Sequence, residues 1–73
     1  MTEKKNVIPR HYNIIIARQE RETSGGKPGD EWAITPNIYG GNCTGENQRT
    51  GERYYIFKEH LKNPAFYTIL HIE

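Results

Sequence analysis

Two glycine-rich stretches of the chain have spacings that phosphate-binding loops use. Gly40–Gly45 has the G-x4-G skeleton of a P-loop, but Glu46 and Asn47 follow it, where a P-loop needs the Lys and the Ser or Thr that hold phosphate and magnesium. The carboxylate of Glu46 would repel the phosphate that a lysine attracts. Residues 26–29, Gly-Lys-Pro-Gly, match the GxxG with which KH domains clamp a nucleic-acid backbone, but their flanks favour extended chain rather than helices. We therefore interpret both stretches as turns.

The side chains that could act as nucleophiles, bases or metal ligands lie far apart in the sequence. Cys43 is the only cysteine, and no histidine lies beside it. The three histidines, His11, His60 and His71, form no paired spacing of the kind that structural zinc sites use. Catalysis requires a nucleophile or base beside an orienting partner. We therefore predict that the protein is not an enzyme and that it binds no metal and no cofactor.

The size and composition of the chain exclude several classes of protein. It has 73 residues, enough for one domain, and 10 Lys and Arg against 9 Asp and Glu give a formal net charge of +1. This balance argues against a histone-like binder of polyanions. The longest apolar run, Ile14–Ala17, is far shorter than the roughly 20 residues of a membrane span. With no export signal in view and a single cysteine, we expect a cytoplasmic protein without a membrane partner.

The organisation of the chain follows its turn signals. We expect residues 1–10 to form a flexible N-terminal arm and residues 11–73 to form a single small α+β domain. The glycine-rich segments 19–30 and 40–51 are expected to be loops. The segments rich in β-branched and aromatic residues are expected to be strands, and they are residues 12–18, 31–35, 53–57 and 66–72.

The segment 52–62 has two interpretations. A strand over 53–57 that leads into a short helical turn is favoured, because aromatic and β-branched residues dominate it. The alternative is one helix over the whole segment, which would place Tyr54, Phe57 and Leu61 on one face. The favoured interpretation gives an α+β fold with a three- to four-stranded, mainly antiparallel sheet and one short helical segment.

Two of the expected strands are apolar on both sides. In residues 12–18 and 66–72, apolar side chains occupy both alternating faces. This pattern is typical of strands that are covered on both faces. Because one short helix can cover only one face, the other needs a loop, a partner or a second copy of the chain. We predict a second copy, and therefore a homodimer.

The aromatic and basic residues indicate a binding function. Tyrosine, tryptophan and arginine dominate the energetics of protein interfaces, and the mixed surface charge suits a protein partner. We expect a small regulator or inhibitor of a larger protein, a kind of protein that phage and mobile elements often encode. The alternative is a β-module that binds single-stranded nucleic acid through the same aromatic, Arg and Lys residues. The expected partner-binding residues are Trp32, Tyr39, Arg49, Arg53, Tyr54 and Tyr55.

Overall fold

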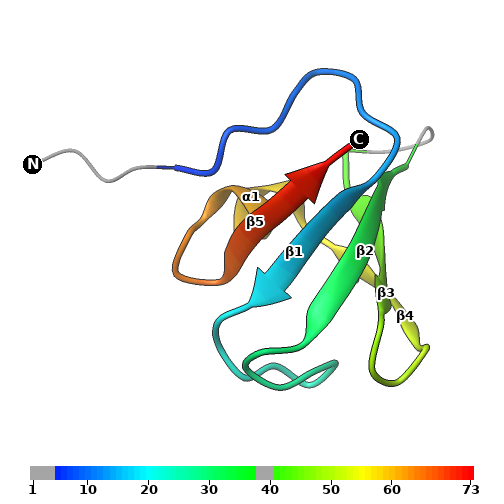
Figure 1. Ribbon diagram of the computed structural model, residues 1–73, viewed down its shortest axis with the longest axis vertical. Helices are drawn as coiled ribbons and strands as arrows, with labels where there is room; N and C mark the ends of the chain where they lie inside the picture. Colours follow the sequence, from blue (N-terminus) through cyan, green and yellow to red (C-terminus); the bar gives the residue numbers. More distant parts are fainter. Residues whose placement is uncertain (1–4, 38–40) are drawn as a thin grey trace, which may run out of the picture.

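Five strands form one antiparallel sheet, in the order β4-β3-β2-β1-β5 (Figure 1). The computed structural model describes residues 5–37 and 41–73. Within these residues the elements are β1 (Ile15–Gln19), β2 (Glu31–Pro36), β3 (Cys43–Asn47), β4 (Arg53–Ile56), α1 (Lys58–Lys62) and β5 (Tyr67–Ile72). The predicted α+β class with an antiparallel sheet is confirmed, but the sheet has five strands rather than three or four.

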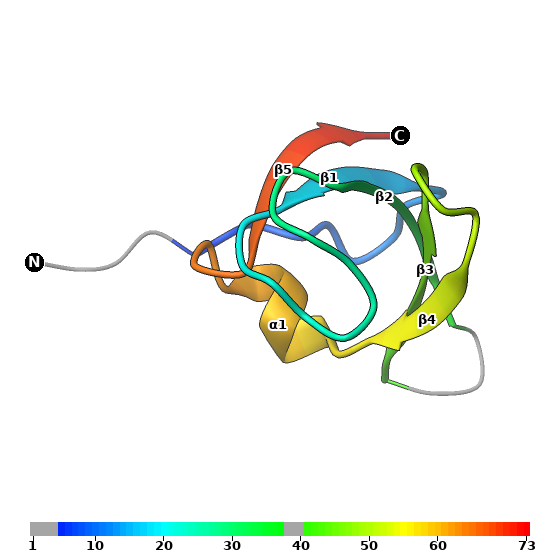
Figure 2. The same cartoon turned by 90° about the horizontal axis from the view of Figure 1, so that it is seen from below.

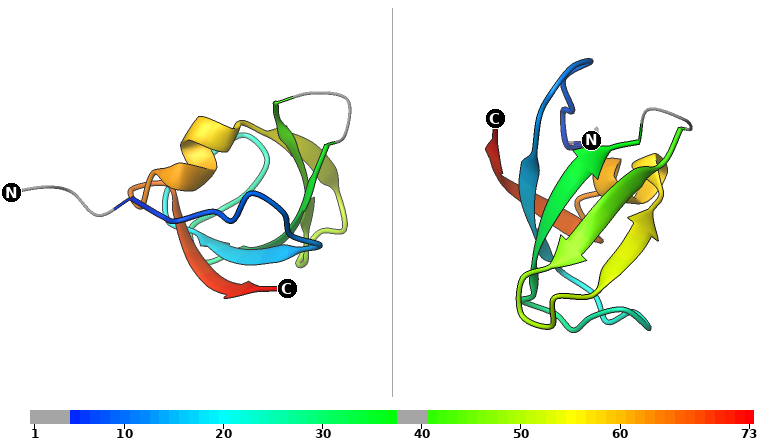
Figure 3. Two further views of the ribbon diagram at one scale, coloured as in Figure 1. Left: turned by 90° about the horizontal axis from the view of Figure 1, so that it is seen from above. Right: turned by 90° about the vertical axis from the view of Figure 1, so that its right-hand side faces the viewer.

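The sheet bends strongly around a concave face. In Figure 2, β5, β1 and β2 form one wall, and β3 and β4 turn away from them to form a second. α1 lies on the concave side, in the gap between β4 and β5. The 20–30 loop, which connects β1 to β2, closes one end of the concave space, and residues 5–13 cross the other end (Figure 3). The fold is therefore a small, barrel-like sheet whose two open ends are covered by irregular chain.

The apolar core fills this concave space. Alternate residues of each strand point into it, because the side chains of a strand alternate between its two faces. In the ladder between β1 and β2, Ile15 pairs with Ile34 and Ala17 with Trp32, and all four are at most 2% exposed. Leu61 of α1 is fully buried and closes the core from the side opposite the sheet. Among the residues that the structure describes, the buried core consists of Ile15, Ala17, Trp32, Ile34, Cys43, Ile56, Leu61 and Tyr67.

The third strand, β3, corrects the expectation that residues 40–51 are a loop. Cys43, Gly45 and Asn47 are buried in alternation, and the strand pairs with β2 on one side and with β4 on the other. The sequence Cys-Thr-Gly-Glu-Asn has little strand propensity of its own, so tertiary context forms this strand. Gly45 is required by packing: a Cβ there would overlap Cδ1 of Ile56 and lie 3.0 Å from Cε3 of Trp32.

A register shift in β5 corrects the interpretation of its two apolar faces. The pairing of β1 with β5 is irregular between Ile16 and Ala17, where Leu70 has no partner in the ladder. The extra residue changes the alternation, so Ile69 and Ile72 both pack against the core while Leu70 is 46% exposed. The last strand is therefore not covered on both faces, and it lies at an edge of the sheet rather than in its centre.

The segment after β3 follows the favoured interpretation of residues 52–62. β4 is a strand, and the chain stays extended at Phe57, with φ −68° and ψ 134°, before α1 begins at Lys58. The alternative of one helix over 52–62 is wrong. Pairing with β3 requires an extended backbone over β4, and only the last five residues of the segment are helical.

Candidate functional site

A groove lies between the 20–30 loop, β4 and α1. Its volume is about 220 Å³. Thr23, Ser24 and Gly25 of the loop form one lip, and β4 together with the start of α1 forms the other. Six aromatic residues line it, and they are Trp32, Tyr54, Tyr55, Phe57, His60 and Tyr67. We call this surface the aromatic groove.

The floor of the aromatic groove is held by Trp32. Its indole is 2% exposed, and Nε1 donates a hydrogen bond to Oε1 of Gln19 at 2.8 Å. The Tyr54 ring packs edge-on against the indole, with ring centroids 5.9 Å apart. The Tyr54 hydroxyl donates a hydrogen bond to the carboxylate of Glu52 at 2.8 Å. The 20–30 loop also packs against the Tyr54 ring, since a Cβ at Gly25 would lie 3.2 Å from it. These contacts hold both rings in place before any ligand binds.

On the helix side of the groove, aromatic rings contact one another in a row. Phe57, which precedes α1, packs edge-on against His60, with centroids 5.3 Å apart. His60 lies 5.0 Å from the ring of Phe66, and the guanidinium of Arg21 lies 5.3 Å above the same phenyl ring. Arg21 reaches across from the 20–30 loop, so this cation–π contact joins the loop to the helix side of the groove.

The lining of the aromatic groove is neutral. Over residues 5–37 and 41–73, no Lys, Arg, Asp or Glu side chain contributes to it. The nearby Glu52 carboxylate raises the pKa of Tyr54 through the hydrogen bond, and burial raises the pKa of Tyr67. Both phenols therefore remain protonated at neutral pH. The surface offers aromatic faces and hydroxyl groups rather than charge.

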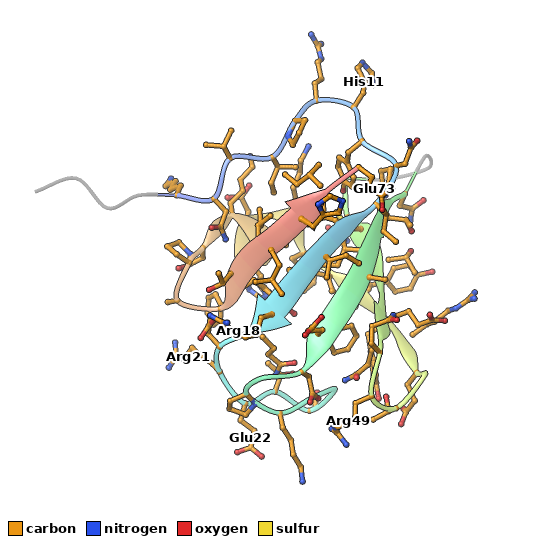
Figure 4. The ribbon with its side chains drawn as sticks, viewed as in Figure 1. His11, Arg18, Arg21, Glu22, Arg49 and Glu73 are labelled. Carbon is orange, nitrogen blue, oxygen red and sulfur yellow. The ribbon has the colours of Figure 1, made fainter. Side chains whose placement is uncertain are left out.

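A buried polar cluster fixes the loop that forms one lip of the groove. Asp30, only 7% exposed, accepts hydrogen bonds from the backbone N–H of Lys27 at 2.9 Å and from Nδ2 of Asn47 at 3.0 Å. Arg49 makes a two-pronged ion pair with the same carboxylate, at the end of the barrel that the loop closes (Figure 4). These donors, with Arg49 foremost, hold the pKa of Asp30 well below its usual range. Gln19, whose Oε1 accepts the Trp32 hydrogen bond, also donates hydrogen bonds from Nε2 to the carbonyl of Arg21 and the hydroxyl of Thr23 in the loop.

The structure places the expected partner-binding residues in different environments. Trp32 is buried beneath the groove, and Arg49 is engaged by Asp30. Tyr54 and Tyr55 line the groove and are 38% and 74% exposed. Arg53 is exposed on β4, with Nε 3.4 Å from a carboxylate oxygen of Glu46. Tyr39 lies outside the described residues.

Three aromatic residues of the groove were missed by sequence reasoning. Phe57 and His60 were assigned to a strand end and a surface turn, and Tyr67 to a strand that was thought to be covered on both faces. The run of aromatic residues from Tyr54 to Phe57 was the available signal. Only the bend of the sheet, which brings α1 opposite the 20–30 loop, places the other rings beside it.

Metal-ligating and thiol groups give no further candidate site among the described residues. No group of three or more His, Cys, Asp or Glu side chains among them could hold a metal ion. Cys43 is buried in β3, and the Tyr12 hydroxyl lies 3.2 Å from its Sγ. Burial, followed by this contact with Cys43, raises the pKa of Tyr12. None of the helices in the described part of the chain has the length and apolar character needed to cross a membrane.

Comparisons with known proteins leave the site to be interpreted from its own geometry. No protein-family model matches the chain, and neither a curated protein nor a solved structure shows significant similarity to it.

Proposed function

We propose that the protein is a small, non-enzymatic binding protein whose aromatic groove takes an extended, uncharged segment of a larger protein. The observation that carries the proposal is that six of the lining residues are aromatic and that none of them in the described ranges is Lys, Arg, Asp or Glu. By occupying such a segment, the protein would compete with other proteins that bind it and so act as a regulator or inhibitor.

The chemistry of the lining supports a peptide as the ligand. Aromatic rings provide large apolar contact area with little loss of side-chain entropy, and they dominate the energetics of protein interfaces. Aromatic-lined grooves bind proline-rich segments, whose polyproline II conformation exists before binding. The rigid contacts of Trp32 with Gln19 and Tyr54 mean that little of the groove has to be ordered on binding. We therefore expect a segment that contains proline and apolar residues.

Single-stranded nucleic acid is the second candidate, and one observation favours it. On β3 and β4, residues Thr44, Arg53, Tyr54 and Tyr55 line a shallow hollow in which a base could stack on an exposed tyrosine. However, Arg53 is paired with Glu46, Arg18 with Glu20 and Arg49 with Asp30. Each of these acids reduces the attraction to phosphate, which supplies most of the affinity for a nucleic-acid chain. We therefore favour the protein ligand.

The proposed site of action is the cytoplasm. The single cysteine of the chain cannot form an internal disulfide, and its thiol is buried and free. Small exported domains usually depend on disulfides for stability, whereas a reducing compartment keeps thiols free.

The test uses Trp32, the only tryptophan, as an internal probe of the groove. A random dodecapeptide library is selected on the immobilised protein, and selected peptides and a thymidine decamer are titrated while Trp32 emission is recorded. We expect uncharged, proline-containing peptides to be enriched and to shift the emission. Tight, salt-sensitive binding of the decamer without peptide enrichment would replace the proposal with the second candidate.

Matched variants locate the binding site. Phe57 in the groove and Leu70 on β5 are both large, exposed and apolar, at 55% and 46% exposed. Phe57→Ala is expected to weaken peptide binding about tenfold or more, the loss typical of a central anchor, whereas Leu70→Ala should leave it unchanged. Equal effects of the two substitutions would contradict the assignment of the groove.

A further inference from the structure

The two edges of the sheet differ in how well they are protected. At the β5 edge, the carbonyl oxygen of Tyr67 accepts a hydrogen bond from Nδ2 of Asn6 at 2.8 Å, and its N–H donates to the carbonyl of Asn63 at 3.1 Å. The bulge at Leu70 interrupts the rest of this edge. Arms and bulges of this kind prevent the edge of a sheet from pairing with another chain. In the described ranges of the chain, the β4 edge has neither an arm nor a bulge.

The open backbone groups of β4 follow from its pairing with β3. The N–H of Asn47 donates to the carbonyl of Glu52 at 2.8 Å, so Glu52 points towards β3. Backbone groups alternate along a strand, and those of Tyr54 and Ile56 therefore also point towards β3. Arg53 and Tyr55 direct their N–H and carbonyl groups to the outside. No hydrogen bond from elsewhere in the described chain reaches them.

Exposed aromatic residues gather at the same edge. Among the described residues five large apolar side chains are exposed, and three of them, Tyr54, Tyr55 and Phe57, lie on β4 or directly after it. Tyr55 is 74% exposed. An edge strand that combines free backbone groups with exposed apolar side chains is a template for pairing with another strand.

We propose that β4 pairs antiparallel with β4 of a second copy of the chain, around a twofold axis at Tyr55. In this register Glu52 of one copy lies opposite Lys58 of the other, and the twofold axis produces this contact twice. Arg53 lies opposite Phe57, which suits a cation–π contact, and Tyr54 lies opposite Ile56. The segment 52–58 is therefore complementary to itself in charge and in apolar character.

The charges at this edge favour a second copy over other occupants. Lys58 makes no ion pair within the described residues, and it begins α1 at the end of the strand. Glu52 is exposed at the other end, where its only side-chain partner among them is the Tyr54 hydroxyl. A strand of arbitrary sequence would not place opposite charges at both ends. Four residues form β4, so the interface is small, and we expect a dissociation constant in the micromolar range.

The dimer and the proposed function use neighbouring parts of the same strand. Tyr54, Ile56 and Phe57 line the aromatic groove and also lie in the paired segment. Pairing itself uses backbone groups that point away from β3. It would place two grooves on one continuous sheet, so that a partner with two suitable segments binds more tightly than one with a single segment. Neither Glu52 nor Lys58 lines the groove, so a charge swap at these two positions tests the dimer without removing a lining residue.

The test is a charge swap read by sedimentation equilibrium. Glu52→Lys places two lysines opposite each other at each end, and Lys58→Glu places two glutamates there. Each variant alone is expected to dimerise at least about tenfold more weakly than the natural sequence, because attraction becomes repulsion at two symmetric contacts. An equimolar mixture of the two variants restores both opposite-charge contacts and is expected to form a heterodimer.

Controls separate this interface from general charge effects. Glu22→Lys and Lys5→Glu make the same charge changes at exposed positions away from β4, and Glu22 lies on the 20–30 loop (Figure 4). Both controls should dimerise like the natural sequence, and circular dichroism confirms that every variant is folded. A monomer at several hundred micromolar would overturn the proposal. So would a dimer that neither charge reversal weakens, or a mixture that stays monomeric.

Discussion

Asp30 and Arg49, far apart in the sequence, form a two-pronged ion pair: Nε of Arg49 donates to Oδ1 at 2.8 Å, and Nη2 donates to Oδ2 at 2.9 Å. The carboxylate is 7% exposed, and its remaining contacts come from the 20–30 loop and from β3. The pair therefore joins the chain that closes one end of the barrel to the turn between β3 and β4. In a protein with a small apolar core, this polar contact defines the shape of one lip of the aromatic groove.

This ion pair predicts the acid sensitivity of the protein. The pKa of Asp30 is lowered in the folded state, so the unfolded chain takes up the proton first as the pH falls. The stabilisation is complete above the pKa of an unfolded aspartate, about 3.9, and is lost as the pH falls from there towards the lower folded pKa. We expect Asp30→Asn to be less stable at pH 7 and to show a shallower loss of stability below pH 5, as urea unfolding at a series of pH values would measure. Glu22→Gln is the control. If the free energy of unfolding of Asp30→Asn fell with pH below 5 as steeply as that of the natural sequence, the prediction would be contradicted.

Gly45 predicts a specific packing defect. Its Cβ would overlap Cδ1 of Ile56 and press on Trp32, so Gly45→Ala should destabilise the protein by about 1–3 kcal/mol. Ile56→Val removes the overlapping methyl group. The double variant Gly45→Ala/Ile56→Val should therefore be more stable than Gly45→Ala alone, although Ile56→Val by itself costs about 0.5–1.5 kcal/mol. Gly41→Ala, at a position with open space around it, controls for the loss of glycine. Additive losses in the double variant would show that the overlap is relieved elsewhere.

The contact between Gln19 and Trp32 predicts a coupling energy. Gln19→Leu removes the acceptor of the indole N–H and should cost about 1–3 kcal/mol, because a buried donor is left without a partner. Trp32→Phe removes the donor. In urea unfolding the double variant should lose less stability than the sum of the single variants, by about 1 kcal/mol. Strict additivity would mean that the hydrogen bond contributes nothing to stability.

Because of the bulge in β5, we expect charged substitutions at the neighbouring positions 69 and 70 to have very different effects on stability. Leu70→Lys places a charge on an exposed side chain and should change stability by no more than about 0.5 kcal/mol. Ile69→Lys directs the charge to the core face and should destabilise the protein by about 2 kcal/mol or more. Thermal unfolding of both variants distinguishes this register from a regular strand. The reverse ranking would exclude the bulge.

The sequence predicts the elements whose side chains create their own signal. The β-branched and aromatic residues of β1, β2, β4 and β5 indicate strands within a few residues of their observed bounds. β3 has no such signal, because its glycine and asparagine are selected by the packing of Trp32 and by the Asp30 cluster. The sequence also could not predict which face of the sheet each β5 side chain occupies, because the bulge shifts the alternation and no residue type in the segment indicates a bulge.

The candidate site could be predicted only in part for a related reason. Tyr54 and Tyr55 were expected to bind a partner because they are aromatic and close to arginines, and they do line the groove. His60 and Tyr67 join them because the sheet bends and α1 fills the gap between its outer strands. That arrangement depends on contacts between distant parts of the chain, which residue types and spacing do not encode locally.

The pairing of β1 with β5 has a consequence for how the protein folds. The ladders β1–β2, β2–β3 and β3–β4 join strands that are consecutive in the sequence, but β1 also pairs with the last strand, nearly the whole length of the chain away. A pairing over such a distance slows folding, because the intervening chain must be closed into a loop before its contacts form. During synthesis, one side of β1 therefore stays open until β5 has emerged from the ribosome. In that interval the nascent chain is at its greatest risk of pairing with the wrong partner.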